Sequence, residues 1–228
     1  EITTRLVGSE MCIRDRQRDA NKRFGYSAKE TLNIMQRLYE SHKVLTYPRT
    51  DSRYITTDVA DTLKERLKAC SVGPYRKLAG SLSMRPIRKN ASFVDNKKVS
   101  DHHAIIPTEQ FVDLTHMTNE ERKIYDLVVR RFLSAFCPPC RYEETVIYAE
   151  SGREQFVARG KVMIDEGFRQ VQEMNCEDED ESSRDMKDQT LPKISQGMEF
   201  KQVQVDIREG KTTPPPRFTA VSYTHLTL

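Results

Sequence analysis

The pattern of apolar and polar positions changes character near Pro139. Before this point, apolar residues recur at steps of three and four, which is the spacing of a helix with one buried face. After it, apolar and polar residues alternate, as they do in half-buried strands. The sequence therefore predicts a helical module followed by a strand-rich module, which is an α+β chain.

Local signals mark the first helices. Residues 17–24 form the end of a helix that Gly25 stops, because glycine suits the left-handed position after a helix. Ser27 and Glu30 then form an S-x-x-E capping box, which opens a helix over residues 28–42. A strand is expected directly afterwards. Helix, tight turn, helix and strand in this order resemble a winged helix-turn-helix, although a helical hairpin that packs a core has the same pattern.

The rest of the helical module contains two more predicted helices. One spans Asp58–Cys70, where apolar residues lie four apart, and the stretch from 72 to 100 is expected to be irregular. The other follows a second capping box, formed by Thr118 and Glu121, and stops at the prolines that follow Cys137. We place the end of the helical module at residue 141.

Three strands are predicted in the second module, at residues 142–149, 155–163 and 198–207. An acidic loop at 173–190 separates the last two. Its run of like charges from Glu177 is typical of a solvated loop and not of a metal site, because nothing fixes the carboxylates in place.

The two ends do not fit this pattern. Residues 7–16 and 221–228 resemble translated sequencing-adapter read-through, and residues 1–6 are either native or part of the same artefact, so residues 1–16 are expected to lie outside the fold. Because the chain begins with glutamate, we expect a piece of a longer product. The expected organisation is a helical module at 17–141, a strand-rich module at 142–209, and the first part of a further domain at 210–220.

Composition excludes a membrane protein and a secreted disulfide scaffold. Of the 228 residues, 37% are hydrophobic and 31% are charged, and no apolar stretch approaches the roughly 20 residues that a membrane span requires. Five cysteines indicate a reducing compartment. Cys137 and Cys140 have the C-x-x-C spacing of zinc ligands, but no second pair follows, so we interpret them as apolar residues at a helix end.

The candidate chemistry lies between Leu45 and Tyr54. Tyr47, Arg49 and Asp51 occupy alternate positions, so they would share one face of the extended strand predicted at Val44–Tyr47. A guanidinium presents a planar fork of donors to phosphate oxygens. A phenol with the ordinary tyrosine pKa of about 10 needs a nearby cation or base before it can attack. The segment predicts a tyrosine nucleophile with a phosphate clamp beside it.

A basic stretch with interleaved aromatic residues follows this segment. It suits a groove for single-stranded nucleic acid, where phosphates are paired and bases are stacked, although a solvated surface loop has the same composition. The candidate DNA-contacting residues are Ser52, Arg53, Arg76, Lys77, Arg85, Arg88 and Lys89.

Four segments in order resemble the type IA DNA topoisomerases, and the topoisomerase III branch most of all. The TYPRTDSRY run around Tyr47 resembles the active-site segment of the family, and residues 101–108 resemble its H-H-A-I-I-P-T motif. Residues 19–32 are similar to the helical stretch that precedes the tyrosine. Residues 214–219 are similar to the family's P-P-x-R-F-T/S motif. The resemblance covers about residues 17–220.

The resemblance implies a reaction. Tyr47 would attack the backbone of single-stranded DNA and form a 5′-phosphotyrosyl ester, which allows relaxation or decatenation without ATP. Arg49 and His102 would be catalytic, with Asp51 and His103 in supporting roles. A helical tyrosine domain with a winged-helix-like element would be followed by part of a β-rich arch.

The resemblance also implies Mg²⁺, which the family binds in an N-terminal toprim domain that does not occur among these residues. We therefore expect no metal ligand in this chain and no activity from the chain alone. The implied partner is single-stranded DNA, bound by a monomer in the cytoplasm, on the nucleoid or a plasmid.

Two other functions stay open. A non-catalytic helix-turn-helix module would bind DNA through its helices and its basic stretch, and would tolerate Tyr47→Phe. Another tyrosine-based DNA transferase is disfavoured. A recombinase would carry its tyrosine after its arginines and histidines, and a relaxase needs a histidine-apolar-histidine motif, whereas His102 and His103 are adjacent.

Overall fold

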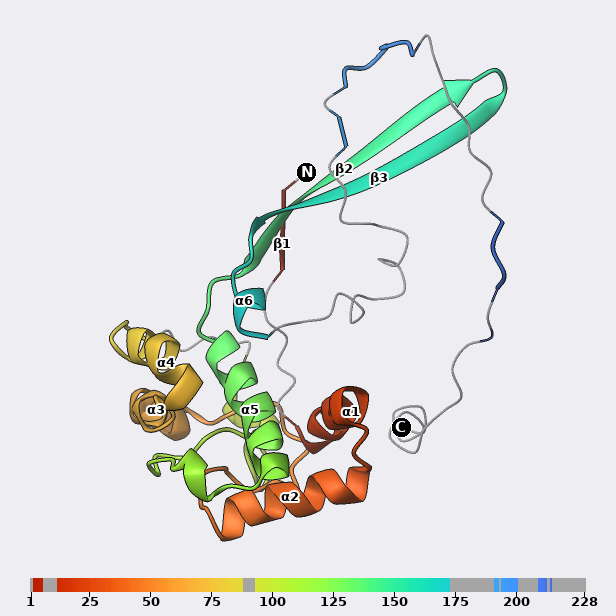
Figure 1. Ribbon diagram of the computed structural model, residues 1–228. Helices are drawn as coiled ribbons and strands as arrows, with labels where there is room; N and C mark the ends of the chain where they lie inside the picture. Colours follow the sequence, from red (N-terminus) through yellow and green to blue (C-terminus); the bar gives the residue numbers. More distant parts are fainter. Residues whose placement is uncertain are drawn as a thin grey trace.

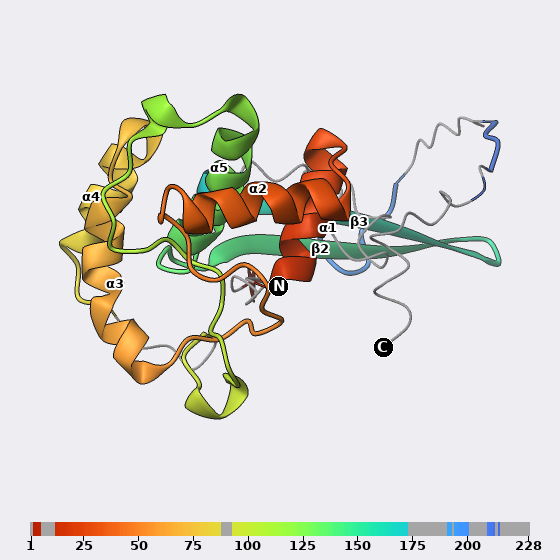
Figure 2. The same ribbon diagram turned by 90° about the horizontal axis from the view of Figure 1, so that it is seen from below.

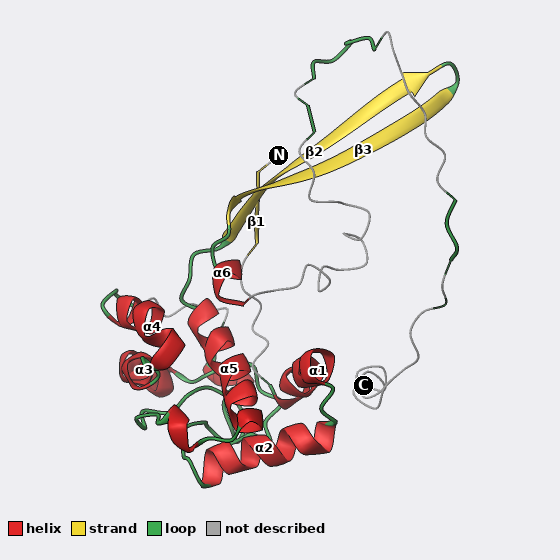
Figure 3. Cartoon of the chain, in the orientation of Figure 1, coloured by secondary structure: helices red, strands yellow, loops and turns green. Residues whose placement is uncertain are grey.

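The protein combines a body of helices with a long β-hairpin that extends away from it, as Figures 1 and 3 show. This agrees with the predicted α+β class. The predicted acidic loop at 173–190 lies outside the described residues. Of the strand predicted at 198–207, only residues 198–200 are described, and they do not form a strand. The computed structural model describes residues 2–5, 12–87, 93–172, 191–192, 194–200, 209–212 and 214.

The first helix, α1 (Ile13–Phe24), begins inside segment 1–16, which was expected to lie outside the fold. Arg16 is buried there, and its Nη1 donates a hydrogen bond to the carbonyl oxygen of Leu127 at 3.2 Å. The helix ends at Gly25, whose φ of 72° is left-handed, as the sequence predicted. The helical body therefore starts earlier in the chain than residue 17.

The second helix, α2 (Ala28–Glu40), confirms the first predicted capping box. The hydroxyl of Ser27 accepts from the Glu30 backbone N–H at 3.2 Å, and the Glu30 carboxylate accepts from the Ser27 N–H at 2.8 Å. Two donors that a helix start leaves without partners are satisfied in this way. Both bonds are local in sequence, which is why the start of α2 was predictable.

Helix α3 (Thr57–Ala69) is confirmed within one residue at each end. The prediction of irregular chain over residues 72–100 was wrong at residues 76–83, which form a helix. A 3-10 turn, η1 (Gly73–Tyr75), leads into α4 (Arg76–Ser83). Ala79 and Leu82 are buried where α4 packs against α3 and α5. This burial stabilises a helix of eight residues, which is too short to be stable by itself.

Helix α5 (Asn119–Ser134) forms the centre of the body and opens with the second predicted capping box. Thr118 Oγ1 accepts from the Glu121 N–H at 3.2 Å. The largest buried side chains of α5 are Ile124, Tyr125, Phe132 and Leu133. The remaining short turns are η2 (Asn96–Lys98) and η3 (Leu114–His116).

The other helices surround α5 on several sides. In Figure 2, α3 and α4 lie together on one side of the body and α1 lies on the other, with α2 crossing between them. Contacts of α5 with α1, α2 and α4 join these helices into one hydrophobic core. Among the described residues, every helix is too short or too polar to cross a membrane.

The strands form one antiparallel sheet in the order β1-β2-β3. The strands predicted at 142–149 and 155–163 are confirmed as β2 (Cys140–Ser151) and β3 (Glu154–Asp165), and both are longer than expected. They pair from Arg141 with Asp165 to Ser151 with Glu154, with one register shift between Arg141 and Tyr142. The third strand, β1 (Ile2–Arg5), was not predicted and pairs with the base of β2.

A tight contact closes the base of the hairpin, where the chain enters it at Pro139 and leaves it at Gly167. Gly167 has a φ of 51°, and a Cβ built on it would lie 2.4 Å from the carbonyl oxygen of Pro139. The short helix α6 (Arg169–Gln172) follows and packs against α5. Only glycine fits at this position, because the φ value and the close approach of the backbone both exclude a side chain.

The predicted strand at Val44–Tyr47 was wrong. Leu45 makes a single antiparallel bridge with Pro107, and the chain bends at Pro48. A continuous ladder does not form, since much of the pairing here uses threonine side chains in place of backbone groups.

Candidate active site

Two segments far apart in the sequence lie side by side, and one carries Tyr47 while the other carries His102. Their closest pairing is the bridge between Leu45 and Pro107. Further backbone hydrogen bonds join them: Thr46 N to Ile106 O at 3.0 Å, Thr108 N to Val44 O at 3.1 Å, and Ala104 N to Tyr54 O at 2.8 Å.

Two threonine side chains add to this pairing. Thr46 Oγ1 donates to the Ala104 carbonyl oxygen at 3.1 Å and accepts from the Ile106 N–H at 3.0 Å. Thr50 Oγ1 donates to the His102 carbonyl oxygen at 3.0 Å. These threonines were not identified from the sequence. They lie one and three positions from Tyr47, so in an extended segment they point to the face opposite the tyrosine, and this spacing could have indicated their role. They hold the tyrosine segment at two points.

The ring of Tyr47 has two aromatic neighbours. The His102 ring lies with its centroid 4.2 Å from the Tyr47 centroid and its plane tilted by 34°. Tyr39, at the end of α2, meets the Tyr47 ring edge to face at 5.6 Å. Tyr47 is half-buried and His102 is exposed. Two residues that the sequence placed 55 positions apart are therefore in contact, with part of each ring open to solvent.

The charged neighbours of Tyr47 point to solvent. Burial alternates from residue 48 to residue 51, although no strand forms there. Arg49 and Asp51 are exposed, and Pro48 and Thr50 are buried. Within the described part of the chain, neither Arg49 nor Asp51 makes a hydrogen bond or an ion pair. The donors of Arg49 are thus available to a ligand.

His103 differs from its neighbour. It is half-buried, and its Nδ1 lies 2.8 Å from the Ala104 carbonyl oxygen, which requires Nδ1 to carry a proton. Burial lowers the pKa of His103 below its ordinary value. A neutral imidazole that donates to the backbone carbonyl of the next residue is suited to holding the segment in shape.

Ser52 and Arg53, both predicted to contact DNA, lie close to the site and are already engaged. Ser52 Oγ donates to the carbonyl oxygen of Lys98 at 3.1 Å. Arg53 Nε lies 3.6 Å from the Asp15 carboxylate, which is buried. The contact with Asp15 ties the tyrosine segment to the start of α1.

The other basic candidates lie elsewhere. Arg76 and Lys77 are exposed on α4, and Arg85 is exposed just after it. Arg88 and Lys89 lie outside the described residues. Across the described chain, no hydrogen bond or ring contact links α4 to the tyrosine segment, so the structure does not bring these residues into one cluster with the site.

The described residues do not suit a metal ion. Nowhere in that part of the chain do three or more histidine, cysteine, aspartate or glutamate side chains converge. Cys137 is half-buried and Cys140 is buried, with its Sγ 3.3 Å from Met163 Sδ.

Comparison with known proteins identifies the family. A family described as DNA topoisomerase matches residues 13–223 of the chain. DNA topoisomerase 3 of Bacillus thuringiensis (strain Al Hakam) is 55% identical over 202 residues, which cover 89% of this chain and 28% of that protein. DNA topoisomerase 3 of Bacillus subtilis (strain 168) is 46% identical over 202 residues. The chain spans 28% of the length of these relatives.

A solved structure agrees at the level of the fold. Full-length topoisomerase I from Thermotoga maritima superposes with a TM-score of 0.56 at 22% identity, covering 77% of this chain and 28% of that one. Because the family match extends over nearly the whole chain and includes both motif segments that meet at Tyr47, this chain belongs to the type IA DNA topoisomerase family, as a part similar to topoisomerase 3.

Proposed function

We propose that this chain supplies the nucleophile of a topoisomerase that cleaves and religates single-stranded DNA, and that Tyr47 is that nucleophile. The observation that carries the proposal is the contact between the Tyr47 and His102 rings, 4.2 Å apart, with exposed Arg49 two residues away. A phenol, an imidazole and a guanidinium at a solvent-accessible edge form a set of groups suited to phosphoryl transfer.

The proposed step balances without a co-reactant. The Tyr47 oxygen attacks the phosphorus of a backbone phosphate, and the bond from phosphorus to the 3′ oxygen breaks. The phenol gives up one proton and the departing 3′ oxygen takes up one. The 5′ phosphate remains esterified to Tyr47, so the free energy of the broken bond is kept and religation needs no ATP. Passage of a strand through the break would relax or decatenate DNA.

The neighbouring residues receive distinct roles in this proposal. Arg49 would bind the non-bridging phosphate oxygens through its planar fork. Asp51 makes no contact with Arg49 among the described residues, and its proposed role is to orient Arg49 or a neighbouring hydroxyl once DNA is bound. His102 donates to a phosphate oxygen next to the attacked phosphorus. His103 supports the segment through its bond to Ala104, as its burial suggests.

The remaining parts of the chain are proposed to bind and frame the DNA. Ser52, Arg53, Arg76, Lys77 and Arg85, with Arg88 and Lys89, would contact phosphates. The helical body, which begins with α1 at Ile13 and not at residue 17, would be the tyrosine domain with a winged-helix-like element. The hairpin would form part of a β-rich arch at 142–209, followed by a further domain from 210.

We also propose that the chain alone is inactive and that the full-length protein is a cytoplasmic, monomeric, Mg²⁺-dependent enzyme acting on nucleoid or plasmid DNA. The described residues offer no cluster to hold the ion, so a toprim domain outside this chain would bind it.

Covalent trapping tests the proposal. The 202 residues that match in the B. thuringiensis enzyme would be replaced by this chain, and the chimera incubated with labelled single-stranded oligonucleotide and Mg²⁺. A denaturation-resistant adduct is expected from the chimera, and none from its Tyr47→Phe variant or from the isolated chain. A folded chimera that binds DNA without forming an adduct would refute the proposal and favour a non-catalytic helix-turn-helix module.

A further inference from the structure

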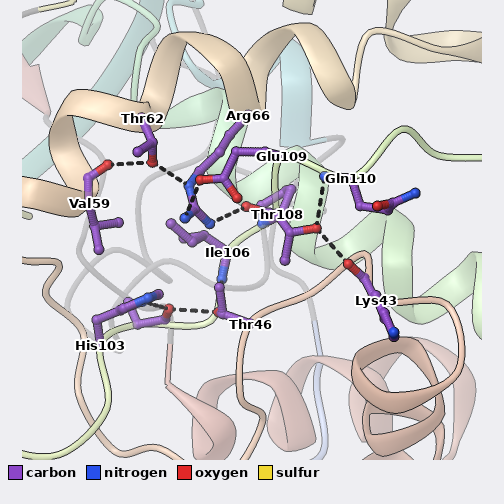
Figure 4. A network of polar contacts seen from close by, with 12 residues as sticks. Lys43, Thr46, Val59, Thr62, Arg66, His103, Ile106, Thr108, Glu109 and Gln110 are labelled. Carbon is purple, nitrogen blue, oxygen red and sulfur yellow. Dashed lines mark hydrogen bonds and ion pairs between the residues drawn. The ribbon is translucent and has the colours of Figure 1, made fainter.

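Arg66 is a buried arginine of α3 whose guanidinium uses all three of its nitrogen atoms (Figure 4). Nη1 donates to the Pro107 carbonyl oxygen at 2.9 Å, and Nη2 lies 2.6 Å from the Glu109 carboxylate. Nε donates to Thr62 Oγ1 at 2.8 Å. The Thr62 hydroxyl in turn donates to the Val59 carbonyl oxygen at 2.9 Å, which leaves its lone pairs toward Arg66.

A buried, paired guanidinium such as that of Arg66 adds little to the free energy of unfolding. Its side chain is 8% exposed, and transferring a charge from water to that depth costs free energy that an apolar side chain of similar volume avoids. Burial accordingly lowers the pKa of Arg66, and Glu109 opposes that shift. The arrangement therefore requires an explanation other than stability, and the identity of its partners supplies one.

The residue that Arg66 holds is the one at which the two site segments meet. Pro107 pairs with Leu45, and Leu45 lies two residues before Tyr47. A carbonyl that is fixed from α3 thus fixes the register between the tyrosine segment and the segment that carries His102.

The same segment is tied on its other side. Thr108 Oγ1 donates to the Lys43 carbonyl oxygen at 2.6 Å and accepts from the Gln110 N–H at 3.3 Å. Lys43 has a φ of 56°, a left-handed value that a lysine adopts only when its surroundings hold it there. Figure 4 shows Arg66 and Lys43 on opposite sides of Thr108. Hydrogen bonds therefore fix Pro107 to α3 and Thr108 to the turn after α2.

We propose that Arg66 is a positioning residue for the reaction: through Pro107 it sets the relative placement of Tyr47 and His102. This inference rests on the proposed function of Tyr47. Arg66 does not touch DNA in this mechanism, because its side chain is buried. Its loss is expected to slow the chemical step and to leave DNA affinity in place.

The test uses the chimera described above, with cleavage of a single-stranded oligonucleotide measured under single-turnover conditions and affinity measured separately. Arg66→Met is expected to lower the cleavage rate at least about tenfold, since a displacement near 1 Å at reacting groups can cost about a hundredfold. The dissociation constant is expected to change by less than about twofold. Arg66→Lys keeps the charge but loses the planar fork, so an intermediate rate is expected.

Arg130→Met is the matched control. Arg130 Nε pairs with Asp126 at 2.8 Å and Nη1 donates to the Val171 carbonyl oxygen at 3.0 Å, so it also joins a helix to a following segment through one carboxylate and one carbonyl. These contacts link α5 to α6, away from the tyrosine segment. Both variants are expected to lose stability, and only Arg66→Met is expected to lose cleavage rate below its melting transition.

Several outcomes would overturn the inference. They are a wild-type cleavage rate in folded Arg66→Met, an equal loss of rate in Arg130→Met, or a loss that lies entirely in DNA affinity. Should Arg66→Met fail to fold, Arg66→Lys decides: the loss of one hydrogen bond predicts a rate at least about threefold lower, and an unchanged rate refutes the inference. Failure of the proposed function is distinguishable, because the unmodified chimera would then form no adduct.

Discussion

The ring of Tyr39 meets the ring of Tyr47 edge to face, with their centroids 5.6 Å apart. Tyr39 belongs to the last turn of α2 and limits the movement of the Tyr47 ring on one side. Its side chain is 37% exposed, so a bound DNA strand could also reach it. Edge-to-face pairs contribute about 0.5–1.5 kcal/mol beyond burial of their area.

Loss of the contact between Tyr39 and Tyr47 is expected to slow cleavage of DNA. In the chimera, Tyr39→Ala should lower the single-turnover rate about three- to tenfold, because the Tyr47 ring gains freedom to leave the His102 side. Tyr39→Phe keeps the edge contact and should retain the rate. Tyr148, an exposed tyrosine of β2, is the matched control, and Tyr148→Ala should have no effect. Equal rates for Tyr39→Ala and the unmodified chimera would contradict the prediction.

A pH dependence of stability is expected from His103. Its pKa in the folded chain is lowered by burial, so the unfolded chain binds a proton more readily. The free energy of unfolding should therefore be unaffected by His103 above its unfolded pKa of about 6.5 and should fall as pH decreases through and below that value. Urea denaturation at a series of pH values measures this.

His103→Gln isolates that contribution. Glutamine does not titrate, so the decline in unfolding free energy just below pH of about 6.5 should be smaller in the variant than in the wild type. His116→Gln is a suitable comparison, since His116 is an exposed histidine whose side chain is 80% accessible. An identical pH profile for wild type and His103→Gln would show that burial does not perturb this imidazole.

Gly167→Ala is expected to destabilise the junction between the hairpin and the helices. The added Cβ would meet the Pro139 carbonyl oxygen at 2.4 Å, and the φ of 51° is itself unfavourable for alanine. Gly25→Ala separates the two effects, because Gly25 has a φ of 72° with nothing within 4 Å of the added Cβ. Thermal melting should show a loss of about 1–2 kcal/mol for Gly25→Ala and a larger loss for Gly167→Ala.

Cys70 should resist thiol reagents until the chain unfolds. It is fully buried between α3 and α4, and burial raises the pKa of its thiol to about 12, so almost no thiolate exists at neutral pH. Mass spectrometry after pulsed alkylation in increasing urea should show Cys70 labelling that follows global unfolding. Rapid labelling of Cys70 in the absence of urea would contradict this, and Cys70→Ser identifies the labelled peptide.

The parts of the fold that were predictable rest on neighbours in sequence. Ser27 with Glu30, and Thr118 with Glu121, are three residues apart, so each capping box is legible without tertiary contacts. Helix α4 was missed because it has only eight residues, among them Gly80, and so short a helix depends on burial of Leu82 against other helices. The strand predicted at Val44–Tyr47 failed for a related reason, as threonine side chains occupy the positions that ladder bonds would need.

Some residues of the candidate site could also be identified from the sequence, and others could not. Tyr47, Arg49 and His102 were identified from the chemistry of their residue types and from motif resemblance, and their roles stay predictions until adduct formation is tested. Arg66 could not be identified, because its partner Pro107 lies 41 residues away and nothing in the local sequence of α3 distinguishes it from a surface arginine.

The bonds between the two site segments have a consequence for biosynthesis. They join residues separated by 50 to 65 positions, from Tyr54 with Ala104 to Lys43 with Thr108. Such long loops must close before the bonds form, which makes them late events in folding. Tyr47 therefore leaves the ribosome after Tyr39 but before the segment at 102–108, and the bonds to that segment are complete only after Thr108 has been translated. A chain that stalls before that point carries the tyrosine but not its surroundings, so truncated products are expected to be inert toward DNA.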